Sequence, residues 1–232
     1  EDNDLIAVNK PSGWLSIPDR HDAEIPSIRN WLQQKYQEVF VIHRIDRDTS
    51  GLLLFAKNET AHKYYNQLFE NRLVKKLYLG LATGLLAEAE GMISQPIEQH
   101  PSIPGKMRIG RSGKPSVTHF KVIEKFRGYS LVECNLETGR THQIRVHMQY
   151  LGHSLVCDEL YGSPDPILLS NFKKKFKLSK EAEAERPLLD RLALHALSIE
   201  LKDMHGKNLL LEAPLAKDIE VALIQLRKFA KV

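Results

Sequence analysis

Residues 43–57 read HRIDRDTSGLLLFAK, a densely polar segment that runs directly into a short apolar one. The apolar part, residues 52–55, is brief and bounded by Gly51 and Lys57, which is typical of a buried β-strand. The polar part therefore lies on a loop that a rigid strand positions. Loops of this kind often carry catalytic side chains.

Within this loop, Asp46 lies between Arg44 and Arg47. The positive charges favour the ionised carboxylate, so we expect Asp46 to be anionic at neutral pH. An anionic carboxylate can act as a base or as a nucleophile without a metal ion. The alternative is a structural turn whose aspartates accept hydrogen bonds from backbone amides. The loop by itself leaves both interpretations open.

A second strand is predicted at residues 76–83, where leucines alternate with Tyr78 and Gly80. Tyr78 then points to the face opposite the leucines. Tyr78 is either a half-buried residue that only packs against its neighbours or part of a functional site. In a site, its ring offers a stacking surface for a nucleobase and its hydroxyl can transfer a proton.

A helix is predicted from Thr141, a candidate N-cap, to Leu151, with Gly152 as its C-terminal stop. Arg145 is displaced by about 100° from Ile144, so it lies beside the apolar stripe of this helix. A half-buried arginine needs an anion, and we expect Asp46 to be that anion.

Four blocks in this order resemble the RluA-type pseudouridine synthases: Lys10–Gly13, the loop from His43 with its strand, Lys76–Leu79, and Gly139–His147. The resemblance extends from residue 5 to about residue 162 and resumes at 191–196. It implies that Asp46 is the catalytic aspartate and that Tyr78 stacks on the base. It also implies that Arg44 enters the RNA and holds the target base flipped, and that Arg145 contacts the aspartate.

The fold class we expect is α+β, with a mixed, largely antiparallel central sheet that forms a cleft and is flanked by helices and loops. The 232 residues suit a single catalytic domain, with an irregular insertion at about 163–187 that carries one short amphipathic helix. The sequence begins at Glu1 without an initiator methionine, which leaves open a missing N-terminal RNA-binding domain.

The composition describes an ordinary globular protein, with 42% hydrophobic and 27% charged residues and no apolar run that could span a bilayer. Neither of the two cysteines, Cys134 and Cys157, has metal-ligand spacing, so we expect a reducing, cytoplasmic location. We expect Cys134 to be a small buried hydrophobe.

The net charge of +4 is only mildly basic, but basic residues gather in one stretch. We expect an RNA-binding surface there, formed by Lys106, Arg108, Arg111 and Lys114. The resemblance implies a ribosomal or transfer RNA substrate, in which a uridine is flipped out and isomerised to pseudouridine. It implies no cofactor, no metal and no obligatory protein partner.

Two other functions are weighed against this one. A metal-dependent hydrolase would use His142, His147 and Asp158, but an i, i+5 spacing does not bring the two histidines together on one helical face. A catalytically inactive RNA-binding module would not need Asp46, Tyr78 and Arg145 together. The sequence does not select the RNA, the uridine, or attack at C1′ rather than C6.

Overall fold

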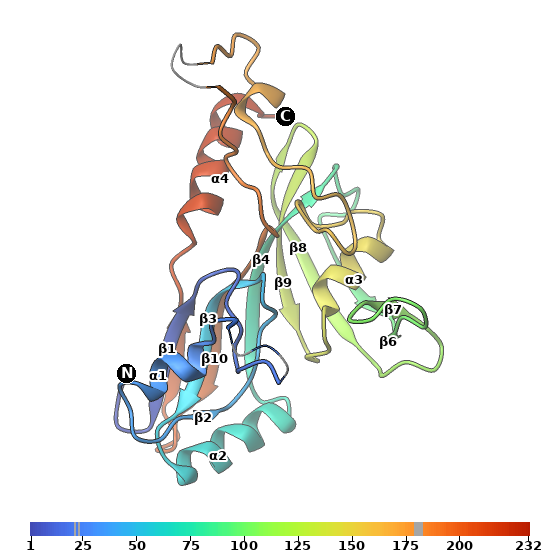
Figure 1. Cartoon of the computed structure of the whole chain (residues 1–232). Helices are drawn as coiled ribbons and strands as arrows, with labels where there is room; N and C mark the ends of the chain where they lie inside the picture. Colours follow the sequence, from blue (N-terminus) through green and yellow to red (C-terminus); the bar gives the residue numbers. More distant parts are fainter. Residues whose placement is uncertain (21, 23, 179–182) are drawn as a thin grey trace. The chain divides into compact units, whose positions relative to one another are not determined.

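A computed structural model gives the fold of residues 1–20, 22, 24–178 and 183–232 (Figure 1). The chain divides into two compact units. The first comprises residues 1–78, 135–137 and 195–214, and the second comprises residues 79–134, 138–194 and 215–232.

The first unit is built on β3 (Ser50–Ala56), in which every residue is buried. Strand β1 (Leu5–Lys10) runs antiparallel to β3, with Leu5 opposite Ala56. Strand β10 (Leu194–Lys202) pairs with β3 in parallel, with His195 opposite Ser50. Two further antiparallel partners are β2 (Phe40–Val41), which pairs with β3, and β11 (Asn208–Glu212), which pairs with β10. The strand predicted at residues 52–55 is confirmed.

Gly51 is required where β3 meets β10. Its φ of +110° is a conformation that other residues rarely adopt. A Cβ atom at this position would lie 2.2 Å from the carbonyl oxygen of Ala196. The two strands can pair in this register only because residue 51 has no side chain.

Two helices and two apolar clusters complete this unit. The helices are α1 (Ile28–Gln33), capped by the Ser27 hydroxyl, and α2 (Glu59–Glu70), capped by Asn58. The Asn58 side chain caps α2 by accepting the Ala61 N–H at 2.8 Å. One cluster includes Leu52, Leu54 and Tyr65, and the other includes Ile28, Leu32 and Leu53. Alternate residues of β3 therefore contribute to different clusters.

Strand β4 (Lys75–Thr83) continues from the first unit into the second. The strand order there is β4, β9 (Tyr129–Leu136), β8 (Val117–Phe126) and β5 (Glu90–Ser94). Strands β6 (Ile97–Gln99) and β7 (Met107–Ile109) form a separate antiparallel pair. Cys134 lies on β9 and is fully buried, as expected.

The second unit also contains α3 (Gln143–Tyr150) and α4 (Lys217–Phe229). Helix α3 was expected to be capped by Thr141, but its N-cap is His142 in the left-handed conformation (φ 56°), without a side-chain cap. Gly152 has a φ of +80°, as a C-terminal stop requires. Helix α4 packs Ile219, Leu223 and Leu226 into the largest apolar cluster of this unit.

The predicted insertion at 163–187 contains a short 3₁₀ helix, η1 (Leu169–Asn171), and an isolated bridge between Ile167 and Leu189. The expected amphipathic α-helix is not found in the described part of this segment. Residues 179–182 lie outside the described residues.

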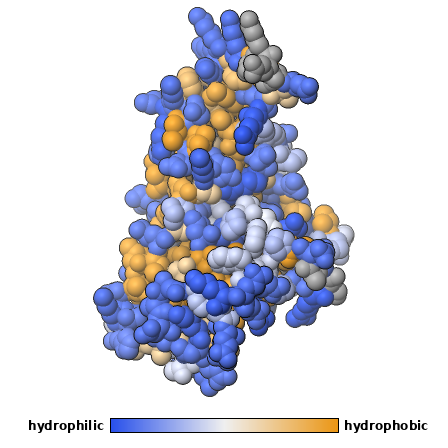
Figure 2. Space-filling view, turned by 60° about the vertical axis from the view of Figure 1, so that its left-hand side comes forward, coloured by the Kyte–Doolittle hydropathy of each residue, from blue (hydrophilic) through white to orange (hydrophobic). Residues whose placement is uncertain are grey.

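The expected fold class is confirmed. Helices and strands are both present, and the pairing of β3 with β10 is parallel. Antiparallel pairs are β1–β3, β2–β3, β10–β11, β5–β8 and β6–β7. Figure 2 shows mainly hydrophilic side chains on one face, with apolar ones gathered into smaller patches. Among the described residues, no helix has both the length and the apolar character needed to cross a membrane.

Candidate active site

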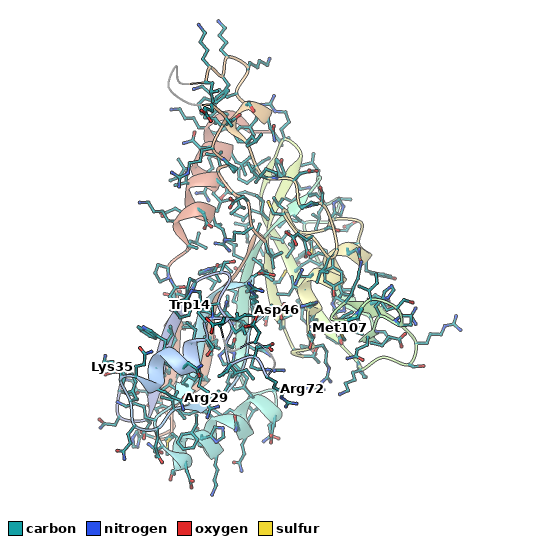
Figure 3. The ribbon with its side chains drawn as sticks, in the orientation of Figure 1. Trp14, Arg29, Lys35, Asp46, Arg72 and Met107 are labelled. Carbon is teal, nitrogen blue, oxygen red and sulfur yellow. The ribbon has the colours of Figure 1, made fainter. Side chains whose placement is uncertain are left out.

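The loop of residues 43–49 is closed by a turn that contains Asp46. The Thr49 N–H donates to the carbonyl oxygen of Asp46 at 3.2 Å. Asp46 itself is partly exposed, whereas Thr49 and Ser50 are buried. In Figure 3, Asp46 lies on this loop of the first unit, and Trp14 lies on the neighbouring segment. The carboxylate therefore lies on an ordered turn at the start of a buried strand.

The segment after β1 holds the loop from one side. The Gly13 N–H donates to the Arg47 carbonyl at 2.9 Å, and the Ser12 hydroxyl donates to the Asp48 carbonyl at 2.7 Å. Lys10 is fully buried, and its ammonium group donates to the carbonyl oxygens of Pro11, Trp14 and Arg47 at 2.7–3.0 Å. A buried ammonium group is tolerated only when it is hydrogen-bonded, so Lys10 joins this segment to the loop.

Ser16 holds the loop on the other side of Asp46. Its hydroxyl donates to the Ile45 carbonyl at 2.9 Å and accepts from the Ile45 N–H at 3.1 Å. Backbone atoms are therefore fixed both immediately before Asp46 and immediately after it. A carboxylate on such a support is pre-organised for chemistry.

His43 fixes the start of the loop to β3. Its Nε2 accepts a hydrogen bond from the Leu54 N–H at 3.1 Å, and its ring stacks on Phe69 with 4.8 Å between the centroids. Burial, together with the charge of Lys76, lowers the pKa of His43 to about 3. The imidazole is therefore neutral at physiological pH, as an acceptor must be. Sequence reasoning assigned His43 no role.

Tyr78 lies near enough to Asp46 for the two groups to interact electrostatically. Desolvation, and next the negative charge of Asp46, raise the pKa of the Tyr78 hydroxyl above its usual value. Tyr78 therefore keeps its proton at neutral pH and can donate a hydrogen bond. Arg44, in contrast, is exposed on the loop. The structure thus gathers Asp46, Tyr78 and Arg44 in the first unit.

In the second unit, Arg145 forms a bidentate ion pair with Asp158. Its Nε donates to Oδ2 at 2.8 Å and its Nη2 donates to Oδ1 at 2.7 Å. Arg145 is 3% exposed and Asp158 is fully buried, so the expectation of a half-buried Arg145 is wrong. The pairing of Arg145 with Asp46 stays a prediction. Sequence reasoning missed Asp158 as a partner because it lies in a loop without any periodic pattern.

Tyr161 joins this ion pair to the β6–β7 hairpin. The Arg145 guanidinium lies 5.0 Å from the centroid of the Tyr161 ring. The Tyr161 hydroxyl accepts from the Met107 N–H at 2.8 Å and lies 2.8 Å from Nδ1 of His142. The hairpin and the start of α3 therefore share one buried aromatic residue.

The predicted RNA-binding residues lie on and beside this hairpin. Arg108, Arg111 and Lys114 are exposed and Lys106 is partly exposed. Arg108 is also paired with Glu98, at 2.7 Å between Nη2 and Oε1. Its charge is therefore partly compensated, which the sequence did not indicate.

The residues weighed as metal ligands are used in other ways. His142 contacts Tyr161, His147 contacts Thr118 Oγ1 and the Gln95 carbonyl, and Asp158 holds Arg145. Across the described ranges, no group of three or more His, Cys, Asp or Glu side chains could hold a metal ion. The three residues thus have structural roles in the second unit.

With this geometry in place, the class of protein is clear. A sequence model described as RNA pseudouridylate synthase matches residues 4–150, so the chain belongs to that family. A ribosomal large subunit pseudouridine synthase D from Nitrosomonas europaea is 38% identical over 235 residues, which cover 98% of this chain and 64% of the relative. A protein of the same name from Haemophilus ducreyi is 34% identical, and the matched region covers 69% of that relative. The chain spans less than two thirds of the first of these two relatives.

Solved structures agree with the fold. The human protein named RNA Pseudouridylate Synthase Domain Containing 1 superposes on this chain with a TM-score of 0.70 and is 27% identical in sequence. The superposition covers 93% of this chain and 81% of the human chain. The human protein named RNA Pseudouridylate Synthase Domain Containing 4 superposes with a TM-score of 0.75 over 98% of this chain and 91% of the human chain. Its 24% identity supports the fold alone.

Proposed function

We propose that this protein isomerises uridine to pseudouridine in RNA, with Asp46 as the catalytic carboxylate. The observation that carries the proposal is the rigid support of Asp46, whose loop is hydrogen-bonded on both sides to the segment after β1. Family membership supports the same reaction. The roles of individual residues are our inference from the residues and their surroundings.

The reaction is a rearrangement without redox change. The N1–C1′ bond breaks, the uracil turns, and a C5–C1′ bond forms, while N1 gains a proton and C5 loses one. The atoms balance without a co-reactant, so no cofactor is needed. A carboxylate that attacks C1′ of the ribose or C6 of the base, and a base that accepts a proton, are sufficient. Asp46 can supply both functions.

Other side chains act on the nucleotide. The protonated Tyr78 provides an aromatic surface for the uracil and a hydroxyl donor beside Asp46. Arg44 is exposed and enters the RNA where the base has been flipped out. We propose Arg145, whose guanidinium is held in place by its ion pair with Asp158, as a further residue that contacts the substrate.

The substrate we propose is structured RNA, in the first place large-subunit ribosomal RNA, which the names of the two bacterial relatives specify. Phosphate contacts come from Lys106, Arg108, Arg111 and Lys114. We propose that the whole chain acts as one catalytic domain and requires no protein partner. Both cysteines are free and buried, which fits the reducing cytoplasm we propose as its location.

The first prediction concerns the substitution Asp46→Asn. The amide keeps the size of the side chain but removes the negative charge, so turnover should fall below detection while RNA affinity stays within about twofold, because affinity comes mainly from phosphate contacts and stacking. Turnover is measured as tritium release from RNA labelled at uridine C5. The RNA is isolated from cells that lack the gene, so that every target uridine is unmodified. Affinity is measured by filter binding of the same RNA.

Asp48→Asn is the matched control, because Asp48 is an exposed carboxylate on the same loop. It should release tritium at nearly the wild-type rate. Comparable release by the Asp46→Asn variant would show that Asp46 is only a structural residue of the turn. Binding without tritium release by the wild-type protein would instead indicate a catalytically inactive RNA-binding module.

A further inference from the structure

Thr49 carries a buried hydroxyl group that has no hydrogen-bond partner among the described residues. The residue is 2% exposed, and its Oγ1 has no hydrogen-bond partner among the described residues. Arg29 Nε is the other such atom, but the Arg29 side chain is partly exposed on α1 (Figure 3). Thr49 is therefore the one buried hydroxyl without a partner in the described part of the chain.

The neighbouring hydroxyl groups are all satisfied. Ser50 Oγ lies 2.9 Å from His195 Nδ1, Ser16 Oγ bonds both polar backbone groups of Ile45, and Ser27 Oγ caps α1. The loop is thus not poorly packed in general. The hydroxyl groups of Ser16, Ser27 and Ser50 are thus paired, whereas that of Thr49 has no partner among the described residues.

An unpaired buried hydroxyl is costly. A buried donor or acceptor without a partner loses its hydration and gains nothing in return, and native structures contain few of them. Valine would fill the same space without that cost. The presence of threonine therefore calls for a partner that arrives from outside the protein.

The position of Thr49 indicates what that partner is. Its N–H donates to the Asp46 carbonyl, and the two Cα atoms of such a turn lie within about 7 Å of each other. Arg47 and Asp48 lie between Asp46 and Thr49 in this turn. Their carbonyl groups accept hydrogen bonds from the Gly13 N–H and the Ser12 hydroxyl, which fix their positions. A nucleotide that places its reacting atoms at Asp46 therefore lies next to the turn that carries Thr49.

We propose that Thr49 is a further substrate-binding residue, whose hydroxyl forms a hydrogen bond with a polar atom of the target uridine while that uridine is held at Asp46. The bond forms only with the flipped nucleotide, so it contributes to turnover more than to the overall affinity for RNA. This inference rests on the proposed isomerisation.

The test compares Thr49→Val with Thr49→Ser, in tritium release from the RNA described above and in thermal unfolding without RNA. We expect the valine variant to unfold at the same or a higher temperature than the wild type, because it loses an unpaired polar group. We also expect its turnover to fall at least about tenfold, with RNA affinity within about twofold. The serine variant keeps the hydroxyl and should stay within about threefold of wild-type turnover.

Thr118→Val is the control for stability. Thr118 is equally buried, but its Oγ1 accepts from Gln143 Nε2 at 2.9 Å and lies 2.9 Å from His147 Nδ1. This variant should unfold at a lower temperature, because it leaves those partners unpaired.

Two results would overturn the inference. Turnover of the Thr49→Val variant within about threefold of wild type would show that the hydroxyl serves no step. A lower unfolding temperature for Thr49→Val, like that of Thr118→Val, would show that the protein itself satisfies the hydroxyl. Failure of the wild-type protein to release tritium would overturn the proposed isomerisation and this inference with it, so the two failures are distinguishable.

Discussion

At the scale of the residue, the polar side chains of Lys10, His43 and Arg145 each have a hydrogen-bonding partner in the folded protein. Lys10 is satisfied by carbonyl oxygens, His43 by an N–H group and Arg145 by a carboxylate. Each arrangement suits the charge of its residue: the ammonium donates, the neutral imidazole accepts, and the guanidinium is neutralised. Removing one partner of such an arrangement exposes the full cost of burying the other.

Arg145→Ala should therefore destabilise the protein strongly. It leaves Asp158 buried without its counter-ion, which costs about 3–5 kcal/mol of unfolding free energy. Asp158→Ala should cost a similar amount for the same reason. Urea unfolding of the two variants measures both values.

The double variant Arg145→Met with Asp158→Leu separates folding from catalysis. Replacing both charges by apolar groups of similar size should restore most of the stability. We expect tritium release to remain low, because we propose that Arg145 also acts at the site. Recovery of both stability and turnover would show that Arg145 is needed only to neutralise Asp158.

At the scale of the element, the loop depends on how it is attached to β3. The His43 imidazole bonds to the Leu54 N–H in the middle of the strand, and Ser50 at its start bonds to His195 on β10. Gly51 allows β3 and β10 to approach at that same end. The loop that carries Asp46 is therefore attached to the most deeply buried strand of its unit.

This attachment predicts a dependence of stability on pH. The pKa of His43 is about 3 in the folded protein and about 6.5 in an unfolded chain. Above pH 6.5 the imidazole is neutral in both states and contributes no pH dependence. Between pH 6.5 and 3 only the unfolded chain takes up the proton, so the unfolding free energy should fall by up to about 1.4 kcal/mol per pH unit. Below pH 3 this contribution levels off.

His43→Gln removes the titrating group while an amide oxygen can still accept from Leu54. Unfolding in urea between pH 7 and 4 should therefore show a smaller loss of stability for the variant than for the wild type. Equal slopes for the two proteins would show that His43 is protonated in the folded state within this range.

At the scale of the whole molecule, the net charge of +4 is too small to explain RNA binding by itself, so the placement of charge matters. Arg111 and Lys114 are both exposed, and Arg108 is exposed but paired with Glu98. A phosphate that binds Arg108 must compete with that carboxylate. We therefore expect these three residues to contribute unequally to binding.

Replacing Arg111 and Lys114 together by glutamine should reduce the slope of log K against log salt by roughly 1.4 to 1.8, or about 0.7 to 0.9 for each lost phosphate contact. Arg108→Gln should reduce the salt slope by less than the roughly 0.7 to 0.9 expected for a full phosphate contact, because Arg108 is paired with Glu98. Filter binding at several salt concentrations gives these slopes. Replacing Lys202 and Lys207 by glutamine removes the same charge from exposed positions of the β10–β11 hairpin and should leave the slope unchanged. An equal decrease in that control would mean that only net charge matters.

The sequence by itself determined the elements with strong patterns. The short apolar run predicted β3, and the alternation after Lys76 predicted β4. These predictions succeed because the burial of apolar side chains follows the geometric period of a strand or a helix. The family was indicated by the resemblance of the four motif blocks to known proteins, and the sequence model that matches residues 4–150 confirms it.

Only the tertiary structure decided how the buried polar residues are paired. His195 lies 145 positions from Ser50, and Asp158 lies 13 positions from Arg145 across a loop. The absence of a partner for the Thr49 hydroxyl among the described residues could likewise be seen only once its surroundings were known. A buried polar side chain pairs with whatever group packing brings within about 3 Å of it, and no period along the chain encodes that distance.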